Sequence, residues 1–335
     1  LDQRTDDGVG YGRAYGQKSF GGKMKYLIIG AGGTGGVLGF FMAKAGKDVT
    51  LIARNEHLTE INKNGLGIHR MWNDTVEYCQ VKAADMESYE AQFCASNEDK
   101  PDVIIVCVKG YSLDSTIPFI RRAAKPETIV IPVLNIYGTG AKMQEKLQEL
   151  LVLDGCIYVS ANIEKPGVLL MHGEILRVVF GVRNPEEFRP ELKEIQRDFA
   201  ESGISGELSD NIQRDALEKF SYVSPIGAAG LYCNACAQDF QREGEPRELF
   251  KAMIREITAL AEAMGYPFEK DYVEVNLKIL SGLAPETTTS MQRDVTAGRK
   301  SEIDGLVYEV VRLGRKYNVS VPVYEKVAKA LGMKE

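Results

Sequence analysis

The sequence is poor in the residues that most often mark a metal or redox centre, with three histidines and six cysteines among 335 residues. The cysteines are scattered and form no disulfide framework. Cys233 and Cys236 make one CxxC pair, but a structural zinc site needs a second pair at suitable spacing, and the sequence has none. We therefore expect no metal site, and interpret the pair as two small side chains near a helix end.

Long apolar segments and basic clusters are also missing. No apolar run approaches the ~18 residues that span a bilayer, and the first 23 residues lack the apolar core of a secretory signal. Lysine and arginine do not gather in a stripe, and the formal net charge is −6. These absences predict a cytoplasmic protein with neither a membrane nor a nucleic-acid partner, and leave a small anionic ligand open.

Three segments differ in their sequence pattern. Residues 1–23 are rich in glycine and scattered charge, which indicates a disordered arm or an expression remnant; the alternative is an arm that packs on a partner subunit. Residues 24–206 alternate apolar runs with helical segments, as βαβ units do. Residues 207–335 show helical periodicity throughout. The sequence thus predicts an α/β fold, in which a Rossmann-type parallel-sheet domain precedes an all-α domain whose apolar positions suit its own core or a homodimer.

The elements that we expect follow from apolar runs and from glycine and proline punctuation. The expected strands are 25–29, 48–53, 103–108, 128–134, 156–161 and 175–181, with a turn at 165–167. The expected helices are 34–45, 186–201, 210–231 with Asp210 as its cap, 246–264, 268–280 and 302–317.

A glycine motif between the first strand and the first helix predicts a dinucleotide site. Gly30, Gly32 and Gly35 match G-x-G-x-x-G in the strand–turn–helix context that the fingerprint requires. These glycines allow a tight turn, close approach of a pyrophosphate, and close packing of the helix on the strand. The residues that we expect to bind the cofactor here are Gly30, Ala31, Gly32, Gly33, Thr34 and Gly35.

The end of the second strand indicates which dinucleotide binds. NAD enzymes place Asp or Glu there to bind the ribose hydroxyl, whereas this strand ends in Arg54. A guanidinium can bind a 2′-phosphate through charge-assisted hydrogen bonds. We therefore expect NADPH/NADP+, although Glu56, two residues further on, keeps NAD open.

Polar residues follow the third and fourth strands of the expected parallel sheet. Lys109 comes directly after 103–108, and Asn135 follows 128–134. Parallel strands present ligand contacts at their carboxyl ends, so we expect Lys109 to face the cofactor phosphates or ribose, and Asn135 to orient nicotinamide or substrate. The alternatives are that Lys109 is a solvated surface lysine and that Asn135 is a plain turn residue.

Carbonyl reduction by a nicotinamide also needs a proton donor. None of His57, His69 and His172 lies in a convincing catalytic context. Lys219 is the better candidate, because it lies where a helix becomes apolar and small-sided, in ALEKFSYVSPIGAAGL. The alternative is a lysine that extends its charged end to solvent.

Several motifs occur together along the chain: GAGGTGG at 30–36, Arg54, VCVKG at 106–110, LEKF at 217–220, and VPVYEKV at 321–327. Within TSMQRDVTAGRKSEIDG at 289–305, the positions that carry a family signature are Ser290, Met291, Asp294, Gly298, Arg299, Glu302 and Asp304. From Gly30 to its end, the chain resembles the ketopantoate reductase (2-dehydropantoate 2-reductase) family.

This resemblance implies that NADPH reduces the keto group of a 2-oxo acid, namely ketopantoate in pantothenate biosynthesis. It implies that Lys219 is the general acid and that Glu302 holds this lysine or a substrate hydroxyl. Ser290 would help to seat the substrate, and Asn135 would contact both nicotinamide and substrate.

Two departures from the family pattern leave alternatives open. Ketopantoate-specific members carry asparagines four and eight residues after the lysine, where this chain has Val223 and Gly227. The usual Asn-Gly after the fourth strand is replaced by Asn135-Ile136-Tyr137-Gly138. The substrate is therefore ketopantoate or another 2-oxo or 3-hydroxy acid. A third hypothesis is an NADP-binding sensor without turnover, against which Lys219 and Glu302 argue.

Overall fold

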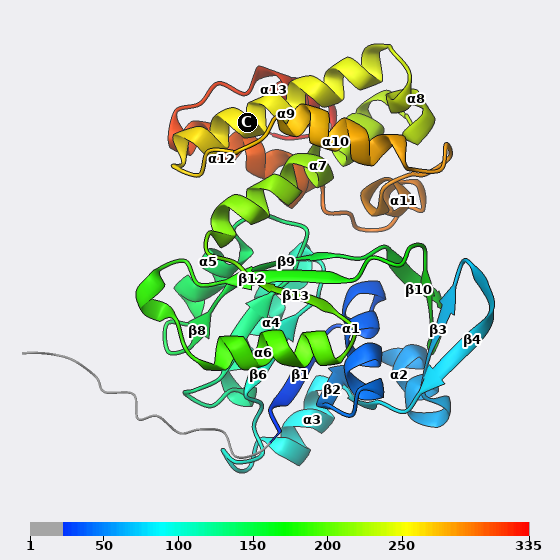
Figure 1. Ribbon diagram of the computed structural model, residues 1–335, viewed down its shortest axis with the longest axis vertical. Helices are drawn as coiled ribbons and strands as arrows, with labels where there is room; N and C mark the ends of the chain where they lie inside the picture. Colours follow the sequence, from blue (N-terminus) through cyan, green and yellow to red (C-terminus); the bar gives the residue numbers. More distant parts are fainter. Residues whose placement is uncertain (1–22, 335) are drawn as a thin grey trace, which may run out of the picture.

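The computed structural model describes residues 23–334, which form a lower α/β domain and an upper helical domain (Figure 1). The arm predicted at residues 1–23 lies outside this range except for Lys23. α7 (Ile212–Cys233) rises from the sheet domain into the helical domain and connects the two. Each domain has its own apolar core.

A six-stranded sheet in the order β5-β2-β1-β6-β7-β8 forms the centre of the first domain, and every neighbouring pair is parallel. This confirms the predicted Rossmann-type sheet. Its strands are β1 (Lys25–Ile29), β2 (Asp48–Ile52), β5 (Lys82–Ala84), β6 (Val103–Val106), β7 (Ile129–Pro132) and β8 (Leu151–Val152). β6 and β7 are apolar along their whole length, and every residue of β1 after Lys25 is buried, because helices and further strands cover both faces.

In the described part of the chain, six α-helices and two 3-10 turns accompany the sheets of the first domain. They are α1 (Gly33–Lys44), α2 (Asn55–Asn64), α3 (Met86–Phe93), α4 (Leu113–Ala123), α5 (Thr139–Lys146), α6 (Glu191–Glu201), and the 3-10 turns η1 (Gly110–Ser112) and η2 (Pro185–Glu187), η1 leading directly into α4. The predicted helix 186–201 is wrong in its first part, because η2 ends at Glu187, Phe188 is extended, and α6 begins only after its N-cap residue Pro190.

Two smaller sheets complete this domain, in the orders β10-β11-β3-β4 and β13-β12-β9. Their strands are β3 (Leu66–Arg70), β4 (Asn73–Cys79), β9 (Asp154–Tyr158), β10 (Ala161–Lys165), β11 (Val168–Met171), β12 (Arg177–Gly181) and β13 (Ser205–Leu208). The strands predicted near 156–161 and 175–181 are present as the antiparallel pair β9 and β12. α1 lies between the main sheet and the β10-β11-β3-β4 sheet, which explains why it is buried on most sides.

The second domain contains only helices from residue 212 to residue 334. After α7 these are α8 (Ala237–Gln241), α9 (Glu245–Ala263), α10 (Tyr272–Ser281), α11 (Ser290–Thr296), the π-helical segment η3 (Asp304–Tyr308), α12 (Glu309–Tyr317) and α13 (Pro322–Ala330). The predicted cap of α7 is wrong by one residue, because Asn211 rather than Asp210 accepts from the backbone N–H of Arg214. The boundary expected at residue 206 falls within β13.

Candidate active site

The glycine turn between β1 and α1 presents a helix N-terminus without a side-chain cap. Gly30 has φ +104°, and a Cβ on Gly35 would lie 2.0 Å from the carbonyl oxygen of Gly30, so both positions require glycine. A Cβ on Gly32 would meet nothing within 4 Å, and Gly32 caps α1 with no side-chain hydrogen bond. The N-terminus of α1 is therefore uncapped by any side chain and the space beside Gly32 is open, two features that suit a phosphate group.

Arg54 lies at the N-cap of α2, beside this turn. Its guanidinium is exposed and forms neither a hydrogen bond nor an ion pair with any residue from 23 to 334. Glu56 follows on the first turn of the same helix and is also exposed. The structure thus places the predicted cation where it is available to an anionic ligand.

His57 contacts the glycine turn, a contact that no sequence motif predicts. One ring nitrogen, Nε2, lies 2.9 Å from the carbonyl oxygen of Ala31. The other, Nδ1, accepts from the backbone N–H of Gly167 at 2.9 Å. No spacing rule connects residues 31, 57 and 167, so only the folded chain brings them together.

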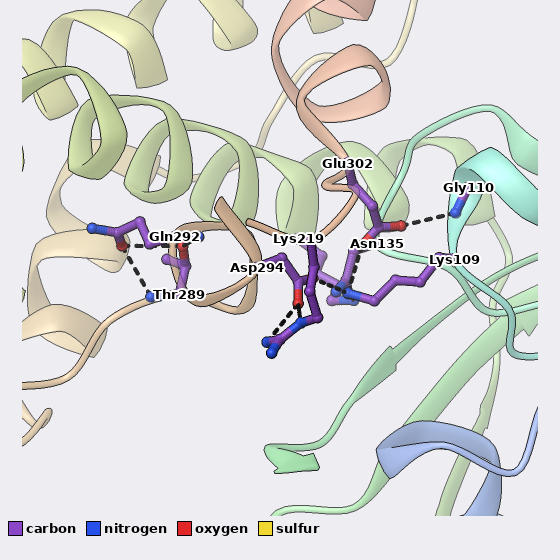
Figure 2. Close-up of polar contacts among 9 residues, drawn as sticks. Lys109, Gly110, Asn135, Lys219, Thr289, Gln292, Asp294 and Glu302 are labelled. Carbon is purple, nitrogen blue, oxygen red and sulfur yellow. Dashed lines mark hydrogen bonds and ion pairs between the residues drawn. The ribbon is translucent and has the colours of Figure 1, made fainter. Parts of the chain in front are cut away.

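Lys219 lies on α7 at the boundary between the domains, where its ammonium is buried. Nζ donates to Oδ1 of Asn135 over 2.8 Å (Figure 2) and lies 5.6 Å from the centre of the Tyr158 ring. Burial lowers the pKa of Lys219, and the charges of Cys156 and Glu302 offset this only in part. A buried ammonium with a lowered pKa is suited to donate a proton.

Asn135 follows β7, as predicted, and the loop that carries it is fixed on both sides. Ile136 belongs to the core of the helical domain, and Tyr137 packs against Phe220 of α7. The buried Asp154 of β9 accepts from the first backbone N–H groups of α5, which supports the far end of the loop. A small cavity bordered by this loop, β9 and α7 includes both Asn135 and Lys219.

Lys109 follows β6 and bonds to the helical domain. Its Nζ lies 3.1 Å from Glu302 and 3.2 Å from Asp294, while Glu302 also accepts from the backbone N–H of Gly110 at 2.9 Å (Figure 2). Burial lowers the pKa of Lys109, but the two carboxylates outweigh it and raise the pKa above its ordinary value. Glu302 thus bonds to Lys109, and the direct hydrogen bond of Lys219 goes to Asn135.

Ser290 is the first residue of α11, and its hydroxyl makes no hydrogen bond within the described chain. α11 packs on α7 because Gly227 and Gly230 have no side chains there. A Cβ on Gly227 would lie 2.8 Å from Cε of Met291, and one on Gly230 would lie 2.7 Å from the Gln292 side chain. At position 227, where the family resemblance leads us to expect asparagine, a Cβ would therefore have Cε of Met291 nearest to it and Oγ1 of Thr289 next, at 3.8 Å.

Neither the described helices nor the described side chains indicate a membrane span or a metal centre. None of the helices is both long and apolar enough to cross a bilayer. Within residues 23–334, no three His, Cys, Asp or Glu side chains are grouped so that they could hold a metal ion. Cys233 ends α7, Cys236 caps α8, and both are free thiols.

The fold and the site define an oxidoreductase of the Rossmann type with a helical second domain. The model of the family described as ketopantoate reductase PanE/ApbA matches residues 26–185, and the model of its C-terminal domain matches residues 211–335. The chain belongs to the ketopantoate reductase family.

Curated relatives cover nearly the whole chain at low identity. The 2-dehydropantoate 2-reductase of Aquifex aeolicus is 27% identical over 316 residues, which are 93% of this chain and 97% of the relative. The uncharacterized oxidoreductase YkpB of Bacillus subtilis is 25% identical over 316 residues, 93% of this chain and 99% of the relative. These matches support an oxidoreductase without fixing its substrate.

Solved structures share the whole fold. The 2-dehydropantoate 2-reductase of Methylococcus capsulatus has a TM-score of 0.78 at 23% identity and covers 92% of this chain and 96% of its own. A D-mandelate dehydrogenase bound to NADH and anilino(oxo)acetate has a TM-score of 0.77 at 22% identity and covers 91% of this chain and 96% of its own. At these identities the likeness establishes the fold alone.

Proposed function

We propose that this chain catalyses the NADPH-dependent reduction of 2-dehydropantoate (ketopantoate) to pantoate, a reaction of pantothenate biosynthesis, with Lys219 as general acid. The observation that carries the proposal is the 2.8 Å hydrogen bond between Lys219 and Asn135. It joins a buried ammonium of the helical domain to the carboxyl end of a parallel strand, the edge of the sheet at which Rossmann-type domains bind their ligands.

Three features of this chain suit NADPH. The uncapped N-terminus of α1 offers N–H groups to a pyrophosphate. The open space at Gly32 admits it, and the free guanidinium of Arg54 suits a 2′-phosphate. When bound, NADPH would supply the hydride for the carbonyl carbon.

The residues at the domain boundary then have separate tasks. Lys219 donates its proton to the carbonyl oxygen, and its positive charge stabilises the negative charge that develops there. Asn135 holds Nζ of Lys219 through Oδ1 and keeps its amide N–H groups for the nicotinamide or the substrate. Hydride and proton together convert the ketone to the alcohol.

Two further residues bind rather than react. The free hydroxyl of Ser290 would seat the substrate. Glu302 accepts from Gly110 and Lys109 and keeps lone pairs for a substrate hydroxyl.

A second candidate is the reduction of another, more apolar 2-oxo acid. It is favoured by Val223 and by the contact between Gly227 and Met291, since this chain has no amides there to bind a hydroxyl of the substrate.

The test is the loss of NADPH absorbance with ketopantoate and with a panel of apolar and aromatic 2-oxo acids. Turnover with ketopantoate alone supports the first candidate, turnover with the others supports the second, and turnover with none supports a sensor. Lys219→Ala should lose ~10²-fold or more in kcat and still bind NADPH. Wild-type turnover in this variant would overturn the role of Lys219 as acid.

A further inference from the structure

The two hydrogen bonds of His57 determine its protonation state. A backbone carbonyl only accepts, so Nε2, which lies 2.9 Å from Ala31 O, carries a proton. A backbone N–H only donates, so Nδ1, which accepts from Gly167, carries none. Both contacts can exist only while the imidazole is neutral.

These bonds join three elements around the glycine turn. Ala31 lies within the turn itself, His57 on the first turn of α2, and Gly167 in the turn between β10 and β11. β10 also packs directly on the start of α1, because a Cβ on Gly33 would lie 2.2 Å from the carbonyl oxygen of Ala161. His57 and β10 therefore support the turn, while Gly32 leaves space for a ligand.

Among the described residues, no ion pair involves the imidazole of His57. The charged side chains of the elements that it joins are Arg54 before α2, Glu56, Glu60 and Lys63 of α2, and Glu164 and Lys165 at the end of β10, whereas the glycine turn contributes no titratable side chain. None of these groups bonds to His57. Burial lowers the pKa of His57, and its bond to Ala31 opposes this only in part, so the neutral form prevails at neutral pH.

We propose that His57 is a positioning residue of the dinucleotide site, in which its neutral ring holds the carbonyl of Ala31 and fixes the glycine turn against the β10–β11 turn. The proposal rests on the dinucleotide binding proposed above. Protonation would place an N–H on Nδ1 against the N–H of Gly167 and break that bond. The two hydrogen bonds of His57 are therefore both present above its lowered pKa, and the bond to Gly167 is lost as pH falls through that pKa.

The test is calorimetric titration of NADPH into the full chain at about pH 7.5 and at about pH 5. His57→Phe removes both bonds and should weaken NADPH binding about tenfold at the higher pH. His57→Gln keeps an amide donor for Ala31 and does not titrate. His69→Gln is the matched control, because within residues 23–334 the His69 side chain bonds to Glu164 of the β10-β11-β3-β4 sheet and to no other residue. This variant should leave NADPH binding unchanged.

The 2′-phosphate of the cofactor titrates near pH 6 in every sample and changes binding as well. Comparison of the variants with the wild type at each pH removes this shared effect and leaves the effect of His57. The ratio of the Kd of His57→Phe to that of the wild type should fall toward one as pH falls. His57→Gln should show the same convergence from a smaller starting ratio. A ratio that equals one at the higher pH, or that does not change with pH, would overturn the proposal.

Nitrogen NMR of wild-type His57 provides a second measurement that needs no variant. It should show the neutral tautomer protonated on Nε2, and protonation on Nδ1 at neutral pH would overturn the proposal. If NADPH binds to neither wild type nor variants, the proposed function fails and this proposal fails with it. If the wild type and both His57 variants bind NADPH equally well, the positioning role is wrong and the proposed function stands.

Discussion

The surroundings of Lys219 make its ammonium group a better proton donor than a solvated lysine. An isolated buried ammonium is costly, and here Oδ1 of Asn135 and the face of the Tyr158 ring offset that cost. Neither contact is a full countercharge, so burial still lowers the pKa of the lysine. The proton is therefore held more weakly than in a solvated lysine.

The lowered pKa leads to a prediction for the pH profile. Lys219 can act as an acid only while it is protonated, so kcat should stay level at low pH and fall as pH rises through a pKa below the ordinary 10.5. Above that pKa the fall should approach about tenfold per pH unit. Steady-state kcat measured from neutral to alkaline pH checks this, and a level profile up to the ordinary lysine pKa would contradict it.

Arg54 gives a second prediction for one side chain. Arg54→Ala should weaken NADPH binding by about 10- to 100-fold, because a charge-assisted bond to the 2′-phosphate is lost. NADH binding should change little, since NADH has no 2′-phosphate. Glu56→Ala, two residues away and equally exposed, serves as the control. Equal losses for both cofactors would remove the phosphate assignment.

Glycines in η1 and η3 allow the loop after β7 to pack closely against both segments. Ile136, in the loop after β7, lies between Gly110 of η1 and Gly305 of η3. A Cβ on Gly110 would lie 2.1 Å from Cδ1 of Ile136, and one on Gly305 would lie 2.3 Å from the same atom. The loop that carries Asn135 thus enters the core of the helical domain through a gap that only glycine leaves open.

We predict that Gly305→Ala lowers the free energy of unfolding by ~1–3 kcal/mol, because the added methyl group overpacks Ile136. Adding Ile136→Val should recover part of this loss by making room. Gly282→Ala is the control in the same domain, since its Cβ would make only an ordinary 3.6 Å contact. Urea unfolding measures all three, and an equal loss for Gly282→Ala and Gly305→Ala would refute the packing argument.

On the scale of the whole molecule, an ionic clasp of Lys109, Glu302 and Asp294 holds the two domains together (Figure 2). Glu302 is buried, with 6% of its surface exposed, whereas Lys109 keeps a partly exposed ammonium. Bound cofactor and this clasp would use the same lysine, so the contact of Lys109 with the cofactor stays a prediction.

Lys109→Met should lower the free energy of unfolding of the ligand-free chain by ~1–3 kcal/mol, because the buried carboxylate of Glu302 loses its cation. Lys146→Met is the matched control, since Lys146 pairs with the exposed Asp114 inside the first domain and should change stability by less than ~1 kcal/mol. Urea unfolding at low salt compares the two. A loss no larger than that of the control would show that the clasp contributes little.

Local pattern predicted the elements whose signals lie within one segment. The glycine turn, the strand-end positions of Arg54 and Asn135, and the lysine on the long helix all follow from periodicity and punctuation. The β3–β4 hairpin was not predicted, because its second strand, NDTVEYC, is polar and mostly exposed. The start of the predicted helix at 186 was misplaced because a capping box of Asn184 and Glu187, with Pro185 between them, produces a separate 3-10 turn.

By itself, the sequence determined the class of fold, the glycine turn between β1 and α1 and the identity of the candidate acid, because each depends on neighbours within a few residues or on a family motif. Only the tertiary structure decided which partner each charged group has. Lys109 bonds to carboxylates more than 180 positions away, and His57 joins residues 31 and 167. Hydrogen bonds and ion pairs depend on distance in space, and no rule of spacing along the chain supplies that distance.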